Sequence, residues 1–265
     1  MLRHCFAALL LIAALLPARA QVPPSAIGVI VMHGKGGAPG GIVSGLADTL
    51  AREGFIVANV EMPWSGRRTY DVTVEDAEKE VEAIAAELRR KGAQRWFLVG
   101  HSQGGVFALH AAGRLRPDGA VAVAPGGSSD AQIMREKLGG RVDEARRLHA
   151  EGKGDDTREF ADHESSKGVY PVTTTARRYL GWFDPDGAMN LFGILSRLPQ
   201  GMPVLLVVPT GDFRALLRMK QPTFEALPKH PLTRLLEPAS DHRRAPVVAA
   251  DDIAKWLREA ANATK

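Results

Sequence analysis

Short apolar runs and amphipathic stretches alternate along the first half of the chain. The apolar runs are continuous and rich in Val, Ile and Ala, which is typical of strands buried on both faces of a sheet. Between them, apolar residues recur at helical spacing, most clearly in a helix that begins after an N-cap at Thr73 and ends near Arg90. This alternation predicts an α/β fold with a doubly wound, mostly parallel sheet. The first strands are expected at residues 27–32, 55–60, 96–99 and 120–124.

The alternation stops after residue 125 and resumes at residue 203. Two further strands are predicted at residues 203–209 and 232–236, separated by a helical stretch. A closing helix is predicted at residues 246–261, with one apolar face turned inward. The sheet is therefore expected to have about six strands flanked by helices.

Residues 126–202 interrupt an α/β core made of residues 21–125 and 203–265. No strand is evident in this stretch. Residues 130–168 carry eight Lys and Arg and ten Asp and Glu but one aromatic, whereas residues 169–192 hold five aromatics. A polar half that faces water and an aromatic half that faces inward predict a helical or irregular cap over an active site. The alternative is an aromatic cluster that only anchors the insertion.

The first 20 residues have the pattern of a secretory signal peptide. An apolar block from Cys5 to Leu16 follows a basic start and precedes Ala18-Arg19-Ala20, which fits an A-x-A cleavage site. The block is too short to span a bilayer comfortably, so no stable membrane span is expected after cleavage. A buried N-terminal helix is the alternative interpretation. We therefore expect an exported protein, periplasmic or secreted, that loses its only cysteine, Cys5, with the signal.

Charge and residue spacing limit the classes of partner. Loss of Arg3 and Arg19 with the signal reduces 34 basic residues to 32, against 30 acidic residues. This near balance, without Lys or Arg runs interleaved with aromatics, gives no indication of nucleic-acid binding. The histidines are scattered and cysteine pairs are missing from the sequence, so no metal site and no cofactor is predicted. The sequence does not indicate an oligomeric state.

Gly100-His101-Ser102-Gln103-Gly104 lies between the third predicted strand and a helix. It has the G-x-S-x-G pattern of a nucleophile elbow, in the strand-to-helix context that the pattern requires. Such a turn brings strand and helix too close together for side chains at the two glycines. It exposes the Ser102 hydroxyl, with the Gln103 N–H available to a developing oxyanion. The alternative is a glycine-rich turn with an incidental serine.

A second glycine-rich loop, His33-Gly34-Lys35-Gly36-Gly37, follows the first predicted strand. In enzymes with an elbow serine this loop supplies the second N–H of the oxyanion hole, here from Lys35 or Gly36. Small residues such as Gly34 allow the backbone to approach a substrate oxygen. The rival interpretation is a phosphate cradle, but neither of the usual glycine spacings of such loops is present. We expect His33 to shape the loop by hydrogen bonding rather than to act as a base.

Two residues that follow the last predicted strands are candidates for the other catalytic groups. Asp212 follows one strand and His242 lies just beyond the next. Because parallel strands end at one rim, Ser102, Asp212 and His242 are expected to meet there, with His242 as base and Asp212 as its orienting acid. For His242 the alternative is a surface histidine that precedes the last helix. The alternative acids are Asp130, Asp184, Asp186 and Asp241.

The sequence resembles the α/β hydrolases over residues 26–125 and 203–262. The resemblance rests on His33-Gly34, the Ser102 elbow, Asp212 and His242. It differs from the full fold of the family in starting at what corresponds to the third strand. The implied sheet therefore lacks the antiparallel hairpin with which the family's sheet begins.

The resemblance implies acyl transfer from a small-molecule substrate through a covalent intermediate on Ser102. The favoured prediction is an exported carboxylic ester hydrolase, similar to esterases and lipases. A hydrolase that cleaves amides or thioesters needs the same residues and is the second alternative. The third is a catalytically silent binding protein of the cell envelope. Substrate choice is expected to depend on residues 126–202, which the resemblance does not cover.

Overall fold

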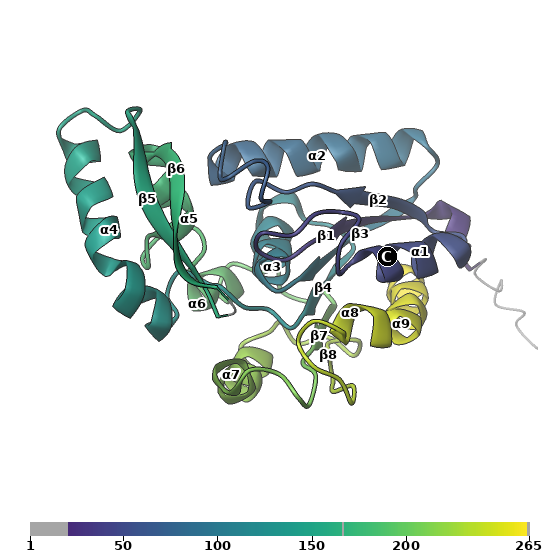
Figure 1. Cartoon of the computed structure of the whole chain (residues 1–265). Coiled ribbons are helices and arrows are strands. Elements are labelled where there is room, and N and C mark those ends of the chain that lie inside the picture. Colours follow the sequence, from purple (N-terminus) through teal and green to yellow (C-terminus); the bar gives the residue numbers. More distant parts are fainter. Residues whose placement is uncertain (1–20, 166, 264–265) are drawn as a thin grey trace, which may run out of the picture.

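The apolar runs of the sequence pair into a single six-stranded sheet in the computed structural model, which describes residues 21–165 and 167–263 (Figure 1). The strands are β1 (Ile27–Met32), β2 (Ile56–Val60), β3 (Arg95–His101), β4 (Gly119–Val123), β7 (Val204–Val207) and β8 (Arg234–Leu236). Their order is β2-β1-β3-β4-β7-β8, and every neighbouring pair is parallel. The predicted fold class and strand number are confirmed. The predicted signal peptide, with Cys5, falls on residues outside the described ranges.

Two layers of helices cover the sheet because successive residues of each strand point to opposite faces. In β1, Ile30 and Met32 join one apolar core, whereas Val29 and Val31 join the other. The first core contains α2 (Val74–Arg90) and α3 (Gln103–Leu115). The second contains α1 (Ser44–Arg52), α8 (Ala245–Val248) and α9 (Ala250–Ala263), while η1 (Pro24–Ala26) precedes β1 and α7 (Arg214–Glu225) follows β7.

The insertion between β4 and β7 forms its own layer beside the sheet (Figure 1, left). It consists of α4 (Gln132–Ala150), β5 (Thr157–Glu164), β6 (Gly168–Thr175), α5 (Ala176–Phe183) and α6 (Leu191–Leu195). The prediction that this stretch contains no strand is wrong, because β5 and β6 pair as an antiparallel hairpin. Only Phe160, Ala161 and Asp162 of β5 are buried, and the exposed charged residues around them conceal the apolar pattern that marks a strand.

Aromatic side chains join the insertion to the core. Trp182 of α5 packs edge-on against Trp64, with ring centroids 5.6 Å apart, and its Nε1–H donates to the carbonyl of Val72 at 2.9 Å. Phe183 packs against Tyr70 at 4.9 Å. Since all four rings are buried, the insertion and the sheet share one apolar core. Among the described residues, no helix is long and apolar enough to cross a membrane.

Candidate active site

The serine of the predicted elbow has the strained backbone that this turn requires. Ser102 lies between β3 and α3 with φ 54° and ψ −120°, a conformation that costs a non-glycine residue about 1–3 kcal/mol. A Cβ on Gly100 would overlap the carbonyl oxygen of Gly104. A Cβ on Gly104 would lie 2.5 Å from the carbonyl oxygen of His33. Both glycines are therefore required for the close approach of strand and helix.

The structure brings Ser102, His242 and Asp212 into one hydrogen-bonded chain. Ser102 Oγ lies 3.1 Å from His242 Nε2, and His242 Nδ1 lies 2.8 Å from Asp212 Oδ1. The loops that carry Asp212 and His242 run side by side beyond β7 and β8, joined by a bridge between Gly211 and Asp241. Residues 140 positions apart thus meet at the carboxyl ends of the strands.

The alternative acids have other partners. Asp241 accepts hydrogen bonds from the N–H groups of Arg243 and Arg244, both at 2.9 Å. Asp130 accepts from the N–H of Leu191. The last two alternatives, Asp184 and Asp186, both pair with Arg146 on α4. Only Asp212 reaches His242 among the five carboxylates considered.

The Asp212 side chain is fully buried. Its Oδ1 accepts from the Phe213 N–H at 2.7 Å as well as from His242. Within the described ranges its Oδ2 is buried without a hydrogen-bond partner. The His242 ring therefore shares Asp212 Oδ1 with a single backbone donor, and no other described side chain donates to the carboxylate.

His101 also contacts His242, although the sequence did not mark it as a functional residue. Its Nε2–H donates to the carbonyl oxygen of His242 at 2.9 Å, and the two rings lie 4.9 Å apart. Burial and the neighbouring His242 lower the pKa of His101 to about 4. A neutral His101 thus fixes the backbone of His242 without adding a second positive charge. Its place beside Ser102 in the G-x-S-x-G pattern was the available signal.

His33 shapes the loop after β1, as expected. Its Nε2 accepts from the N–H of Met62 at 3.0 Å, and its Nδ1–H donates to the carbonyl of Gly34 at 2.7 Å. Its own carbonyl accepts from Trp64 Nε1–H at 2.8 Å. Burial lowers the pKa of His33, which keeps the ring neutral for both hydrogen bonds. A Cβ on Gly34 would lie 3.1 Å from Ser102 Cβ, so the loop passes directly beside the serine.

Of the two candidate backbone N–H groups in the loop after β1, those of Lys35 and Gly36, only one is left free by the described residues to bind an oxyanion. The N–H of Gly36 donates to the carbonyl of Trp64 at 2.8 Å, so the alternative that Gly36 serves as the oxyanion donor does not fit the structure. The N–H groups of Lys35 and Gln103 make no hydrogen bond to any of the described residues. Lys35 and Gln103 therefore remain as the candidate pair of donors beside Ser102.

A mostly apolar pocket of about 220 Å³ opens onto Ser102 and His242. Ile42 from the loop before α1, Ile133 and Met134 from α4, and Phe213 and Leu216 near α7 line it. The charged groups along its wall are Lys35, Glu164 and Arg243. Because α4 and the end of β5 contribute to the lining, the insertion forms part of the wall, as a cap requires.

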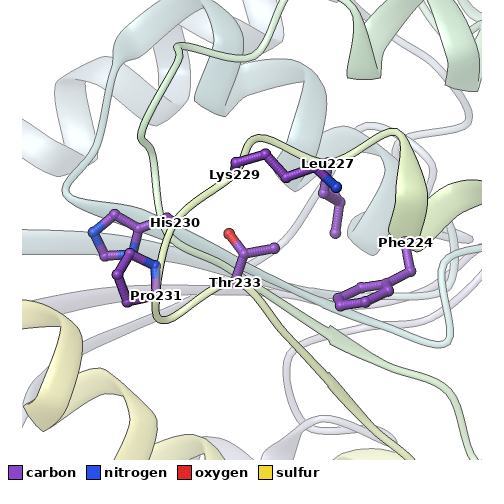
Figure 2. A pocket seen from close by; sticks show the side chains of 6 residues that line it. All are labelled: Phe224, Leu227, Lys229, His230, Pro231 and Thr233. Carbon is purple, nitrogen blue, oxygen red and sulfur yellow. The ribbon is translucent and has the colours of Figure 1, made fainter.

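A second, shallower hollow of about 380 Å³ lies away from these residues (Figure 2). Figure 2 shows its side chains at the end of α7, where Phe224 lies, and on the segment that connects α7 to β8. Thr233 precedes β8, so this hollow lies at the amino end of that strand, opposite the end that bears His242. Its lining is Phe224, Leu227, Lys229, His230, Pro231 and Thr233, without a serine or a carboxylate. In the described ranges, no cluster of three or more His, Cys, Asp or Glu is arranged to hold a metal ion.

Comparisons with known proteins agree with this architecture. The sequence model of the Alpha/beta hydrolase family matches residues 29–258, a span that includes Ser102, Asp212 and His242. A search of curated proteins found no match. Among solved structures, the monoacylglycerol lipase of Paleococcus ferrophilus has a TM-score of 0.61 at 21% identity, over 88% of this chain and 94% of the lipase.

Two further solved structures have the same TM-score of 0.61. Est1E from Butyrivibrio proteoclasticus, solved with ferulic acid bound, is 15% identical over 88% of this chain and 87% of its own. A structure described for LipS and LipT, two metagenome-derived lipolytic enzymes, is 19% identical over 91% of this chain and 96% of its own. At these identities the likeness establishes a common fold.

Proposed function

The chain belongs to the α/β hydrolase family, and we propose that it hydrolyses carboxylic esters of small molecules through a covalent intermediate on Ser102. The contact of Ser102 with His242 at 3.1 Å, backed by Asp212 at 2.8 Å, carries the proposal. These distances lie within the range that proton transfer between nucleophile and base requires.

In the proposed reaction His242 acts as the general base. Its Nδ1–H donates to Asp212, which leaves Nε2 to accept the proton of Ser102 as the serine oxygen attacks the ester carbonyl. The buried Asp212 carboxylate holds this tautomer and stabilises the imidazolium that forms. His242 then protonates the leaving alcohol, and water repeats the sequence to release the acid.

We assign the oxyanion of each tetrahedral intermediate to the N–H groups of Lys35 and Gln103. The first belongs to the loop after β1 and the second to the first turn of α3, where the helix dipole favours negative charge. Each donor of this kind contributes about 10²–10³ to the rate.

The pocket supports an ester with a short, apolar acyl group. Its lining is mainly apolar, and its volume of about 220 Å³ is smaller than the ~300–1,000 Å³ common for ligand sites. Ile133 and Met134 from the insertion and Leu216 from α7 face the space in which the acyl group would lie.

We also propose that the protein is exported. The basic start, apolar block and A-x-A ending of residues 1–20 support this proposal. The test is the intact mass of the protein recovered from the periplasm or medium of an expressing bacterium. A mature chain that starts at residue 21 supports export, whereas a full-length cytoplasmic chain contradicts it.

Labelling with a fluorophosphonate probe tests the nucleophile. We expect the wild type to be labelled at Ser102, and Ser102→Ala to remain unlabelled. A folded wild type that takes up no label would instead favour a catalytically silent binding protein.

A substrate panel tests the bond that is cleaved. p-Nitrophenyl esters of increasing acyl length should show the highest kcat/KM for short chains, because the pocket is small. An amide and a thioester with the same acyl group form the matched comparison. A higher kcat/KM for either of them than for the ester would overturn the ester assignment while leaving Ser102 as nucleophile.

A further inference from the structure

A fully buried carboxylate of the insertion, that of Asp162 on β5, is hydrogen-bonded at both oxygens. Its Oδ1 accepts from the Lys35 ammonium at 2.5 Å and from the N–H of His163 at 2.6 Å. Its Oδ2 accepts from the hydroxyls of Tyr70 at 2.7 Å and Tyr170 at 2.8 Å. Burial raises the pKa of both tyrosines, so they remain protonated donors.

Docking of the insertion does not by itself account for this charge pair. Trp182 packs on Trp64 with ring centroids 5.6 Å apart and Phe183 on Tyr70 at 4.9 Å, so buried aromatic rings already supply an apolar contact between the insertion and the core. Transfer of a carboxylate and an ammonium group out of water is costly, and apolar replacements of buried ion pairs are often neutral or stabilising. A functional reason for the pair lies in the residues that it holds.

Asp162 holds the side chains of both residues assigned to the oxyanion hole. It contacts Lys35 directly, and the Lys35 ammonium also donates to the carbonyl of His163 at 3.2 Å. The Tyr70 hydroxyl donates its one hydrogen to Asp162 at 2.7 Å, and its oxygen, 3.3 Å from the Gln103 side-chain amide, can accept from the NH₂ of that amide when the amide is turned by 180°. Each oxyanion residue is therefore fixed at the far end of its side chain, while its backbone N–H is left for the substrate.

We propose that Asp162 is a positioning residue for the oxyanion hole, acting on Lys35 directly and on Gln103 through Tyr70. This inference rests on the proposed serine hydrolase function. In this role Asp162 lets the insertion help to stabilise the transition state, whereas its other contribution is to line the pocket. Asp162 itself does not touch the substrate.

Misplaced oxyanion donors affect the transition state more than substrate binding. A displacement of about 1 Å costs on the order of 100-fold in rate. The apolar pocket binds the acyl group through contacts that do not involve these amides. Loss of Asp162 should therefore lower kcat and leave KM nearly unchanged.

Asp162→Asn tests this directly because it keeps the shape and removes the charge. With p-nitrophenyl acetate we expect kcat to fall about 10- to 100-fold at a nearly constant KM. The affinity for a trifluoromethyl ketone, which forms a tetrahedral oxyanion on the serine, should fall by a similar factor. A wild-type kcat, or an unchanged affinity for the ketone, would overturn the proposal.

Tyr179→Phe is the matched control for packing of the same hairpin. The Tyr179 hydroxyl donates to the carbonyl of Ala161 at 2.7 Å, next to Asp162, but does not contact the carboxylate. We expect its kcat to stay near the wild-type value although it also loses a buried hydrogen bond. A loss of kcat equal to that of Asp162→Asn would assign both effects to the structure of the insertion and overturn the proposal.

If Asp162→Asn does not fold, a pair of tyrosine variants tests the positioning role instead. Tyr70 and Tyr170 donate to the same Asp162 oxygen, but only Tyr70 also reaches Gln103. Tyr70→Phe should therefore lower kcat several-fold more than Tyr170→Phe. Equal losses, or a larger loss for Tyr170→Phe, would contradict the proposed route to Gln103.

Labelling separates this inference from the function on which it rests. A wild type that fluorophosphonate does not label at Ser102 refutes the serine hydrolase proposal itself. A wild type that is labelled and active, combined with wild-type kinetics in Asp162→Asn, refutes only the positioning role.

Discussion

Replacement of His101 by Gln should reduce the loss of stability that the protein undergoes in acid. His101 is 3% exposed, and its Nε2–H donates to the carbonyl of His242. Burial, followed by repulsion from His242, lowers the pKa of His101 to about 4, against the smaller raising effects of the hydrogen bond to the His242 carbonyl and of Asp212. Among the described residues its Nδ1 has no partner, so protonation of that atom gains no hydrogen bond.

The size of this loss of stability follows from the difference between the proton affinity of His101 in the folded chain and in the unfolded chain. The pKa of an unfolded histidine is about 6.5, so the unfolded chain takes up the proton first as the pH falls. The contribution to the free energy of unfolding is therefore fully present above pH ~6.5 and is lost progressively down to pH ~4. Between pH 7.5 and pH 5 the loss from this one residue is about 2 kcal/mol.

Urea unfolding at the two pH values, followed by tryptophan fluorescence, measures this loss. The wild type should lose about 2 kcal/mol more than His101→Gln, whose amide NH₂ can still donate to the His242 carbonyl. Burial also lowers the pKa of His33 and His163, but their contributions are common to both proteins and cancel. Equal losses in the two proteins would refute a neutral, buried His101.

Asp212→Asn should lower kcat on p-nitrophenyl acetate by about 10⁴, because the amide no longer favours the required His242 tautomer, and a loss below tenfold would exclude Asp212 as the acid. Gly104→Ala should lower the free energy of unfolding in urea by about 3 kcal/mol or prevent folding, since its Cβ meets backbone oxygens of Met32 and His33. Gly139→Ala should instead raise the free energy of unfolding by about 0.5–1 kcal/mol, because this helical position has open space around it. A lower free energy of unfolding would contradict the open environment. Ile133→Ala should raise KM for the preferred ester about threefold to tenfold, and an unchanged KM would remove this side chain from the acyl site.

Features that are determined by residues close together in the sequence could be predicted: the strands, the elbow glycines and the residues that follow the strands. The four inner strands were expected from continuous apolar runs, which record burial on both faces, and the edge strands β2 and β8 from shorter apolar stretches. The Gly100 and Gly104 positions mark a close approach of backbones that any side chain would block. Asp212 and His242 could be located because parallel strands all end at the same rim of a sheet.

The strands of the insertion and its buried carboxylate were not predicted, because the residue types in this stretch are typical of exposed structure. The β5 strand carries charged residues on its exposed positions, so its sequence indicates a loop. Asp162 lies in that stretch and has the sequence signature of a solvated charge, yet it is fully buried. Lys35 likewise has the signature of a surface residue of a glycine-rich loop.

The sequence by itself determined the fold class, the elbow and the candidate Ser102, His242 and Asp212, because each leaves a mark in local composition or in strand order. Only the tertiary structure showed that the Gly36 N–H is already bonded to Trp64, and that Asp212 is the one of the five candidate carboxylates that contacts His242. It also joined Lys35 to Asp162 across 127 positions of the chain. A buried ion pair exists only where two distant segments exclude water together, and no local pattern encodes that meeting.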